Sequence, residues 1–142
     1  MRFVALDHVQ LAMPPGGEDA ARQFYCKVLG LEELRKPPVL AARGGVWFGS
    51  GAVQLHLGVE QDFRPARKAH PAVRVEDLDG LAARIEATGH EVRFDSDLPG
   101  YRRFYVTDPF GNRLEFVELA SIKRPNKRLH PTAFGEIKMR RG

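Results

Sequence analysis

Three histidines and one glutamate have the residue types and the spacing of a metal site. His8 and His56 fall in the first and last strands expected in the first half of the chain, and His70 and Glu115 take the matching places in the second half. Neutral imidazoles and a carboxylate suit Zn²⁺, Ni²⁺, Mn²⁺ or Fe²⁺, and the absence of a nearby cysteine excludes a thiolate site. A lone histidine in a strand is more often a hydrogen-bonded structural residue. The prediction of a metal site therefore depends on the matched placement.

The elements that must position these residues occur twice, as a strand, a helix and three more strands. In the first half we expect a strand at 6–13, a helix from about 18 to 29, and strands at 31–35, 39–48 and 52–58. In the second half we expect a strand at 70–75, a helix from Asp77 or Asp79 to Gly89, and strands at 91–95, 103–107 and 113–119. His8 and His70 lie at equivalent places, 62 positions apart.

This repeat predicts an α+β fold made of paired βαβββ modules that form a curved mixed sheet around a cavity. Each half alone has one sheet face to bury and little to bury it against, whereas two halves side by side can enclose a ligand-sized space. We expect one domain at 1–120, with module one at about 4–59 and module two at about 69–120. The polar segment 59–69 connects them.

Five segments resemble the successive blocks of the vicinal oxygen chelate superfamily of glyoxalases, bleomycin-resistance proteins and ring-cleaving dioxygenases. They are LDHVQLAM, FYCKVLGLEEL, VQLHLGVE, AHPAVRVEDLDGLAARIEATGHEV and FYVTDPFGNRLEFVEL. The likeness covers about residues 5–119 and is most specific in the FY-x-x-(V/L)-LG-(L/F) and DP-x-GN-x-(L/I)-E blocks. It implies paired βαβββ modules, usually in homodimers, with one metal per cavity. By resemblance the ligands are His8, His56, His70 and Glu115.

The second ligand position departs from the pattern of the glyoxalase I-like members, which usually have glutamate or glutamine there. Here it is His56, with Gln54 two residues away on the same strand face. A set of three ligands, His8, His70 and Glu115, would instead resemble the dioxygenases and fosfomycin-resistance enzymes, with His56 lining the cavity. Both readings stay open at the level of the sequence.

Several neighbours are candidate substrate contacts. Arg74 has the strand parity of His70, and its guanidinium would suit a carboxylate or phosphonate. The other candidates are Gln10, Gln54, Trp47, Arg103 and Tyr105. In the alternative interpretation Arg102 and Arg103 are solvated, and one of Trp47 and Phe48 belongs to the core.

These features predict a divalent-metal-dependent enzyme, a lyase, isomerase or dioxygenase, acting on a small oxygen-rich substrate, with an anionic substrate among the expected ones. The ion would act as a Lewis acid, and Glu115 would be the catalytic residue that moves a proton. The alternative is a metal-free protein of the bleomycin-resistance type, which binds an antibiotic or metabolite. A structural zinc site is a third, weaker reading.

Composition agrees with a single small cytoplasmic domain. The chain has 142 residues, of which 43% are apolar, and Cys26 is its only cysteine, so an internal disulfide is excluded. No apolar run approaches a membrane span, and the first residues do not resemble a secretory signal. The net charge of +4 comes from residues 121–142, where seven basic residues face Glu136 alone. We expect this basic tail to be a flexible extension, and we expect the domain to bind no nucleic acid.

Overall fold

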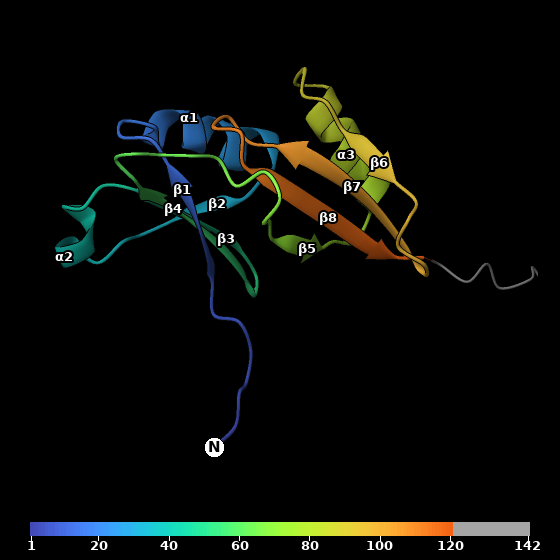
Figure 1. Cartoon of the computed structure of the whole chain (residues 1–142), viewed down its shortest axis with the longest axis horizontal. Coiled ribbons are helices and arrows are strands. Elements are labelled where there is room, and N and C mark those ends of the chain that lie inside the picture. Colours follow the sequence, from blue (N-terminus) through green and yellow to red (C-terminus); the bar gives the residue numbers. More distant parts are fainter. Residues whose placement is uncertain (121–142) are drawn as a thin grey trace, which may run out of the picture.

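The computed structural model describes residues 1–120, which form two modules of the same construction (Figure 1). Module one holds a four-stranded sheet in the order β1-β4-β3-β2, in which β1 runs parallel to β4 and the other neighbours are antiparallel. Its elements are β1 (Val9–Met13), α1 (Glu18–Arg22), η1 (Gln23–Val28), β2 (Glu32–Leu34), α2 (Pro38–Ala41), β3 (Val46–Ser50) and β4 (Val53–Val59).

Module two repeats this topology in the order β5-β8-β7-β6, again with the first strand parallel to the last. Its elements are β5 (Ala72–Arg74), α3 (Leu78–Glu86), β6 (Arg93–Asp95), β7 (Tyr101–Thr107) and β8 (Arg113–Leu119). The predicted α+β fold of paired βαβββ modules is confirmed. Within residues 1–120 the sheets are two separate four-stranded sheets, with β1 and β5 at the edge of each.

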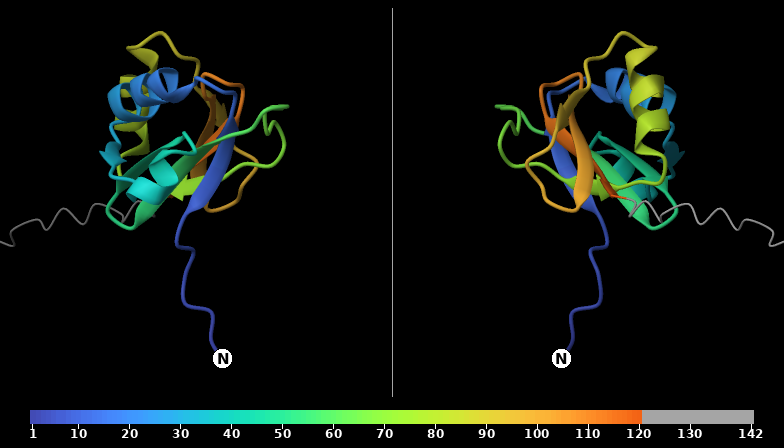
Figure 2. Two further views of the ribbon diagram at one scale, coloured as in Figure 1. Left: turned by 90° about the vertical axis from the view of Figure 1, so that its left-hand side faces the viewer. Right: turned by 90° about the vertical axis from the view of Figure 1, so that its right-hand side faces the viewer.

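The helices α1, η1 and α3 lie on the same side of the two sheets (Figure 2). One continuous apolar core fills the space between them, and its largest fully buried side chains include Tyr25, Phe24, Phe48 and Phe104. Burial of this apolar area is the main force that holds the modules together. The strand faces turned away from the helices are therefore free for the residues that could do chemistry.

Local sequence explains where the helices begin. Asp77 takes a left-handed conformation with φ of 59°, and its side chain accepts a hydrogen bond from the Gly80 amide at 3.0 Å, which caps α3. The acidic Glu18 and Asp19 stand in the first turn of α1, where negative charge suits the helix dipole. Beyond its five residues α1 continues as the π-helix η1.

The strand expected at 39–48 is wrong in its first half. Residues Pro38–Ala41 form the short helix α2, and β3 begins only at Val46. Proline at the start of α2 has the backbone angle that a first helical turn requires. Gly44 and Gly45 then adopt positive φ values of 73° and 86°, which separates the helix from the strand.

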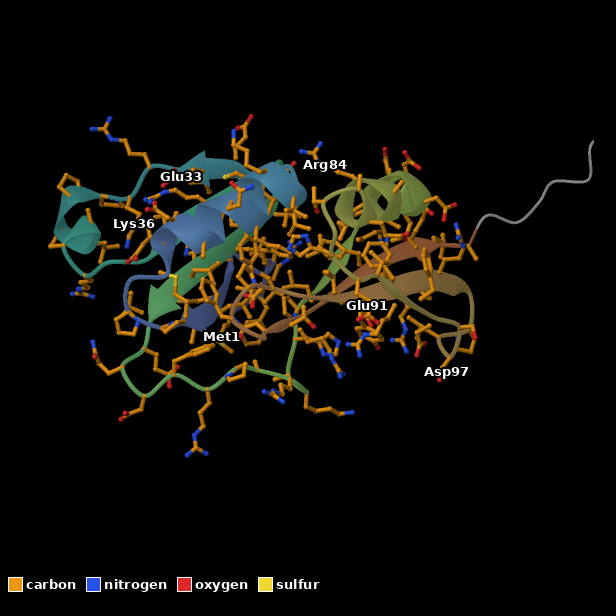
Figure 3. The ribbon with its side chains drawn as sticks, turned by 90° about the horizontal axis from the view of Figure 1, so that it is seen from above. Met1, Glu33, Lys36, Arg84, Glu91 and Asp97 are labelled. Carbon is orange, nitrogen blue, oxygen red and sulfur yellow. The ribbon has the colours of Figure 1, made fainter. Side chains whose placement is uncertain are left out.

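A buried polar network ties module two to module one through the DPFGN turn. The Tyr25 hydroxyl donates to Asp108 Oδ2 at 2.9 Å, and Asn112 Nδ2 donates to the Ala12 carbonyl at 2.8 Å. Asn112 Oδ1 accepts from the Ala66 amide in the connection between modules at 3.0 Å. On the helix side Arg84, labelled in Figure 3, donates from α3 to the Val28 carbonyl at the end of η1.

Residues 1–7 leave the edge of module one as an extended arm (Figures 1 and 2). Of the seven large hydrophobic side chains exposed among residues 1–120, four are on this arm: Met1, Phe3, Val4 and Leu6. Among residues 1–120 no helix is both long and apolar enough to cross a membrane. The basic tail predicted at 121–142 lies outside the described residues.

Candidate functional site

Strand register places the four proposed ligands at equivalent points of the two modules. Gln10 of β1 is the register partner of His56 in β4, and Ala72 of β5 is the register partner of Glu115 in β8. His8 and His70 each stand two residues before these partners and outside the strands, since His8 directly precedes β1 and Pro71 separates His70 from β5. His56 and Glu115 are therefore structural counterparts, as are His8 and His70.

In module one the first donor pair is a stack of rings. The His8 and His56 ring centroids are 4.2 Å apart at an interplanar angle of 14°, and Trp47 stacks on His56 at 4.2 Å and 8°. Gln54 Oε1 lies 3.1 Å from His56 Nε2. His56 is buried, and this burial lowers its pKa below the usual 6.5, so the imidazole is neutral at pH 7 and able to act as a ligand.

In module two the second donor pair is an imidazole beside a buried carboxylate. His70 Nε2 lies 3.8 Å from Glu115 Oε1, and Glu115 is only 5% exposed. Arg103 donates to Glu115 Oε1 at 2.8 Å and to Asp95 Oδ1 at 3.1 Å, so its charge offsets two carboxylates. This pairing gives the buried Glu115 carboxylate a hydrogen-bonded partner of opposite charge.

The second ring nitrogen of each leading histidine has an oxygen partner. His70 Nδ1 lies 2.7 Å from the Lys68 carbonyl, and His8 Nδ1 lies 2.8 Å from the Asp7 carboxylate. These oxygens can only accept, so Nδ1 must carry the proton in both rings. In the neutral imidazole the lone pair then belongs to Nε2, which is the arrangement of a metal-ligating histidine with an oriented second shell.

A cavity of about 780 Å³ lies between the edges of the two modules. His8 of module one and His70 of module two both line it, together with three of the predicted substrate contacts, Gln10, Gln54 and Arg74. The described part of the chain contains no group of three or more His, Cys, Asp or Glu residues arranged to hold an ion. Each module therefore presents a pair of donors, and the two pairs do not meet within residues 1–120 of a single chain.

Some of the remaining candidate substrate contacts touch a donor pair, and the others lie elsewhere. Tyr105 lies edge-on to His70 with ring centroids 5.6 Å apart, and Trp47 belongs to the stack in module one. Phe48 is fully buried, so it is the core member of its pair with Trp47, as one interpretation expected. Arg102 makes two hydrogen bonds to Asp79 of α3, at 2.8 and 2.7 Å, and takes no part in the site.

Sequence reasoning missed two residues that border Glu115 and its partners. The Asp95 carboxylate forms an ion pair with Arg103, in addition to the one that Arg103 forms with Glu115. The Arg113 guanidinium lies 5.2 Å from the Tyr105 ring centroid. Strand parity could have found Arg113, because it stands two residues before Glu115 and shares its sheet face. Asp95 required the register of β6 against β7, which pairs it with Arg103.

Residues 5–116 match the family model described as the Glyoxalase/Bleomycin resistance protein/Dioxygenase superfamily. This match covers most of the chain. The chain belongs to this superfamily, as the motifs had indicated. No curated protein matches the sequence.

Three solved structures illustrate the range of relatives. A putative glyoxalase family protein from Bacillus anthracis is 47% identical, covering 84% of this chain and 98% of its own, with a TM-score of 0.82. TnmS3, an antibiotic-binding protein from Streptomyces sp. CB03234, is 22% identical over 83% and 100%, with a TM-score of 0.64. A FosX variant from Listeria monocytogenes, a fosfomycin resistance protein in complex with Mn(II), is 17% identical over 84% and 95%, with a TM-score of 0.67. The last two show the fold alone.

Proposed function

We propose that this protein is a divalent-metal-dependent enzyme acting on a small oxygen-rich substrate, with His8, His56, His70 and Glu115 as the metal ligands. The observation that carries the proposal is the pair of donors at register-equivalent points of each module. His8 stacks on His56, and His70 lies 3.8 Å from Glu115. Three imidazoles and one carboxylate fit Zn²⁺, Ni²⁺, Mn²⁺ or Fe²⁺.

The chain's own residues would then divide the work. The bound ion supplies Lewis-acid stabilisation of negative charge on substrate oxygens. Glu115 would accept or return a proton, held in place by Arg103 at 2.8 Å. Trp47, stacked on His56, would limit the access of water to that side of the site. Gln10, Gln54 and Arg74 would contact the substrate from the cavity wall.

A second copy of the chain would bring the donor pairs together. Both sheets end at exposed edges, β1 and β5, and the pairs stand beside these edges. Free sheet edges favour pairing with another chain, and closed symmetric dimers are the commonest soluble assembly. We therefore propose a homodimer in which module one of one copy faces module two of the other, giving two equivalent sites.

Replacing Glu115 with glutamine tests the proposal. Glutamine nearly keeps the shape of glutamate but lacks its negative charge, so the affinity for Zn²⁺ or Mn²⁺ should fall at least about 10-fold. Isothermal titration calorimetry of metal-stripped protein measures this. Glu91→Gln, at an exposed position, is the matched control and should bind like the wild type. Wild-type binding weaker than roughly 10⁻⁴ M for every one of the four metals, or unchanged binding in Glu115→Gln, would refute the metalloenzyme.

The second candidate is a metal-free binding protein for an antibiotic or metabolite. The observation that favours it is the 780 Å³ cavity, combined with the absence of a group of three metal donors among residues 1–120. The metal content of protein purified without a histidine tag separates the two. About one ion per chain supports the enzyme, and a metal-free protein that still binds ligands supports the alternative.

A further inference from the structure

The two modules present different walls to the proposed site although their backbones correspond. Trp47 is the register partner of His56, and Tyr105 is the register partner of Glu115, so these two aromatic residues are counterparts. Two residues before His56 and Glu115 stand Gln54, which pairs with Gly49, and Arg113, which pairs with Thr107. A neutral amide in module one therefore corresponds to a guanidinium, Arg113, in module two.

The arginines near Glu115 differ in whether a protein carboxylate already pairs with their charge. Arg103 contacts the carboxylates of Asp95 and Glu115, at 3.0 and 2.8 Å. The Arg113 side chain, by contrast, makes no ion pair or hydrogen bond with any side chain of residues 1–120. Its guanidinium lies 5.2 Å from the centroid of the Tyr105 ring, and the residue is half-buried. Arg74 and Arg93 share this face but are exposed.

Within residues 1–120, Arg113 is therefore a positioned cation with no carboxylate bound to it. The contact with Tyr105 restricts where the guanidinium can lie, and partial burial makes its charge costlier to leave uncompensated than a fully solvated one. Tyr105 in turn touches His70 of the second donor pair. A ligand whose oxygens reach His70 and Glu115 thus has a free guanidinium fork close beside it.

We propose that Arg113 binds a carboxylate or phosphoryl oxyanion of the ligand, so that the substrate class of this site is a small anion. The inference deepens the proposed function, since it rests on the outer face of module two being part of the ligand cavity. The sequence suggested this anion-binding part for Arg74, which is exposed, and Arg103 donates to protein carboxylates instead. A planar guanidinium matches the two oxygens of such a group bidentately.

Calorimetric titration of the full chain with phenylphosphonate tests this assignment. The protein is kept in EDTA so that no metal contributes, and benzyl alcohol serves as the neutral probe. We expect the wild type to bind phenylphosphonate more tightly than benzyl alcohol, and Arg113→Gln to lose at least about 10-fold of that affinity. Glutamine is the matched choice because Gln54 holds the corresponding position in module one. Arg102→Gln, whose arginine is engaged by Asp79, should bind like the wild type.

Equal affinity of Arg113→Gln and wild type, or no wild-type binding of phenylphosphonate up to about 10 mM, overturns the assignment. If Arg113→Gln does not fold, as judged by its thermal melt, Arg113→Lys takes its place. Lysine keeps the charge but cannot form the bidentate contact, so a loss of about 5-fold is expected and an unchanged affinity refutes the role. Metal titration of the same variants tests the proposed function independently. Arg113 is not among the proposed ligands, so its replacement should leave the metal affinity unchanged.

Discussion

The tautomers of His8 and His70 follow from oxygen atoms close to them in the sequence. Asp7 and the Lys68 carbonyl each accept from a ring Nδ1, which leaves the Nε2 of His8 and His70 as the electron-pair donor. His56 differs, since its Nε2 is the atom next to Gln54 and its free atom is Nδ1. In the proposed site the three imidazoles would therefore bind the metal through different nitrogens.

Replacing His56 with alanine separates the four-ligand from the three-ligand reading. With four ligands, the metal affinity should fall about as much as in Glu115→Gln, at least about 10-fold. With three ligands, metal binding should stay near that of the wild type and only the ligands accepted by the cavity should change. Calorimetric titration with Zn²⁺ and Mn²⁺ measures the difference. The matched control is His90→Ala, which removes a histidine that belongs to neither donor pair.

Residue types and spacing predicted the four candidate ligands because alternation along a strand decides which side chains share a face. The same rule predicted that Gln10, Gln54 and Arg74 face the cavity, and all three line it. The pairing of Arg103 with Asp95 and Glu115 could not be predicted, since it depends on the register between β6, β7 and β8. A sequence shows that an arginine is present, but not which carboxylate has taken its donors.

At the scale of elements, the strands that alternate clearly were predicted well, and the last strand has the bounds expected, Arg113–Leu119. The failure at 39–48 has a local cause. Val39 and Leu40 are apolar enough for a strand, but the preceding prolines favour a helical turn and the following glycines end it. The buried hydrogen bonds that join the turn Asp108–Asn112 to Tyr25 and Ala12 appear only in three dimensions.

Tyr25→Phe should lower the free energy of unfolding by about 1.5–3 kcal/mol, because it removes a buried hydrogen bond to a charged group, Asp108. Urea denaturation at pH 7 measures this. Tyr101→Phe, at the start of β7, is the control and should change stability little. An equal stability of Tyr25→Phe and wild type would contradict a stabilising role for the network.

The same bond predicts a dependence on pH. Burial raises the pKa of Tyr25 well above its usual 10.0, so the folded protein keeps this proton at a pH where the unfolded chain loses it. The stabilisation by Tyr25 is therefore complete below pH 10 and is lost as the pH rises further. The difference in stability between wild type and Tyr25→Phe should narrow above pH 10.

At the scale of the molecule, the extended arm needs a partner surface. Phe3 and Leu6 are 92% and 84% exposed, and Leu6 lies at the wall of the cavity between the modules. Exposed apolar side chains gathered in this way favour association. If the arm packs against the second copy of the proposed homodimer, it stabilises the assembly that joins the two donor pairs.

Replacing Phe3 and Leu6 together with serine should weaken the dimer at least about 10-fold, since burying each such side chain contributes about 1.5–3 kcal/mol. Sedimentation equilibrium over micromolar concentrations measures the dissociation constant. Val39→Ser, which removes an exposed apolar side chain from α2, should leave it unchanged. A wild-type mass of one chain throughout would contradict the homodimer itself.

The central claim, that the two donor pairs hold one divalent ion, is tested most directly by anomalous scattering from crystals grown with Mn²⁺ or Zn²⁺. The account predicts one anomalous peak per site, bound by His8 and His56 of one copy and by His70 and Glu115 of a second copy. A peak bound by His8, His70 and Glu115 but not by His56 would support the interpretation with three ligands. A peak bound by other side chains, or both donor pairs empty at saturating metal, would contradict it.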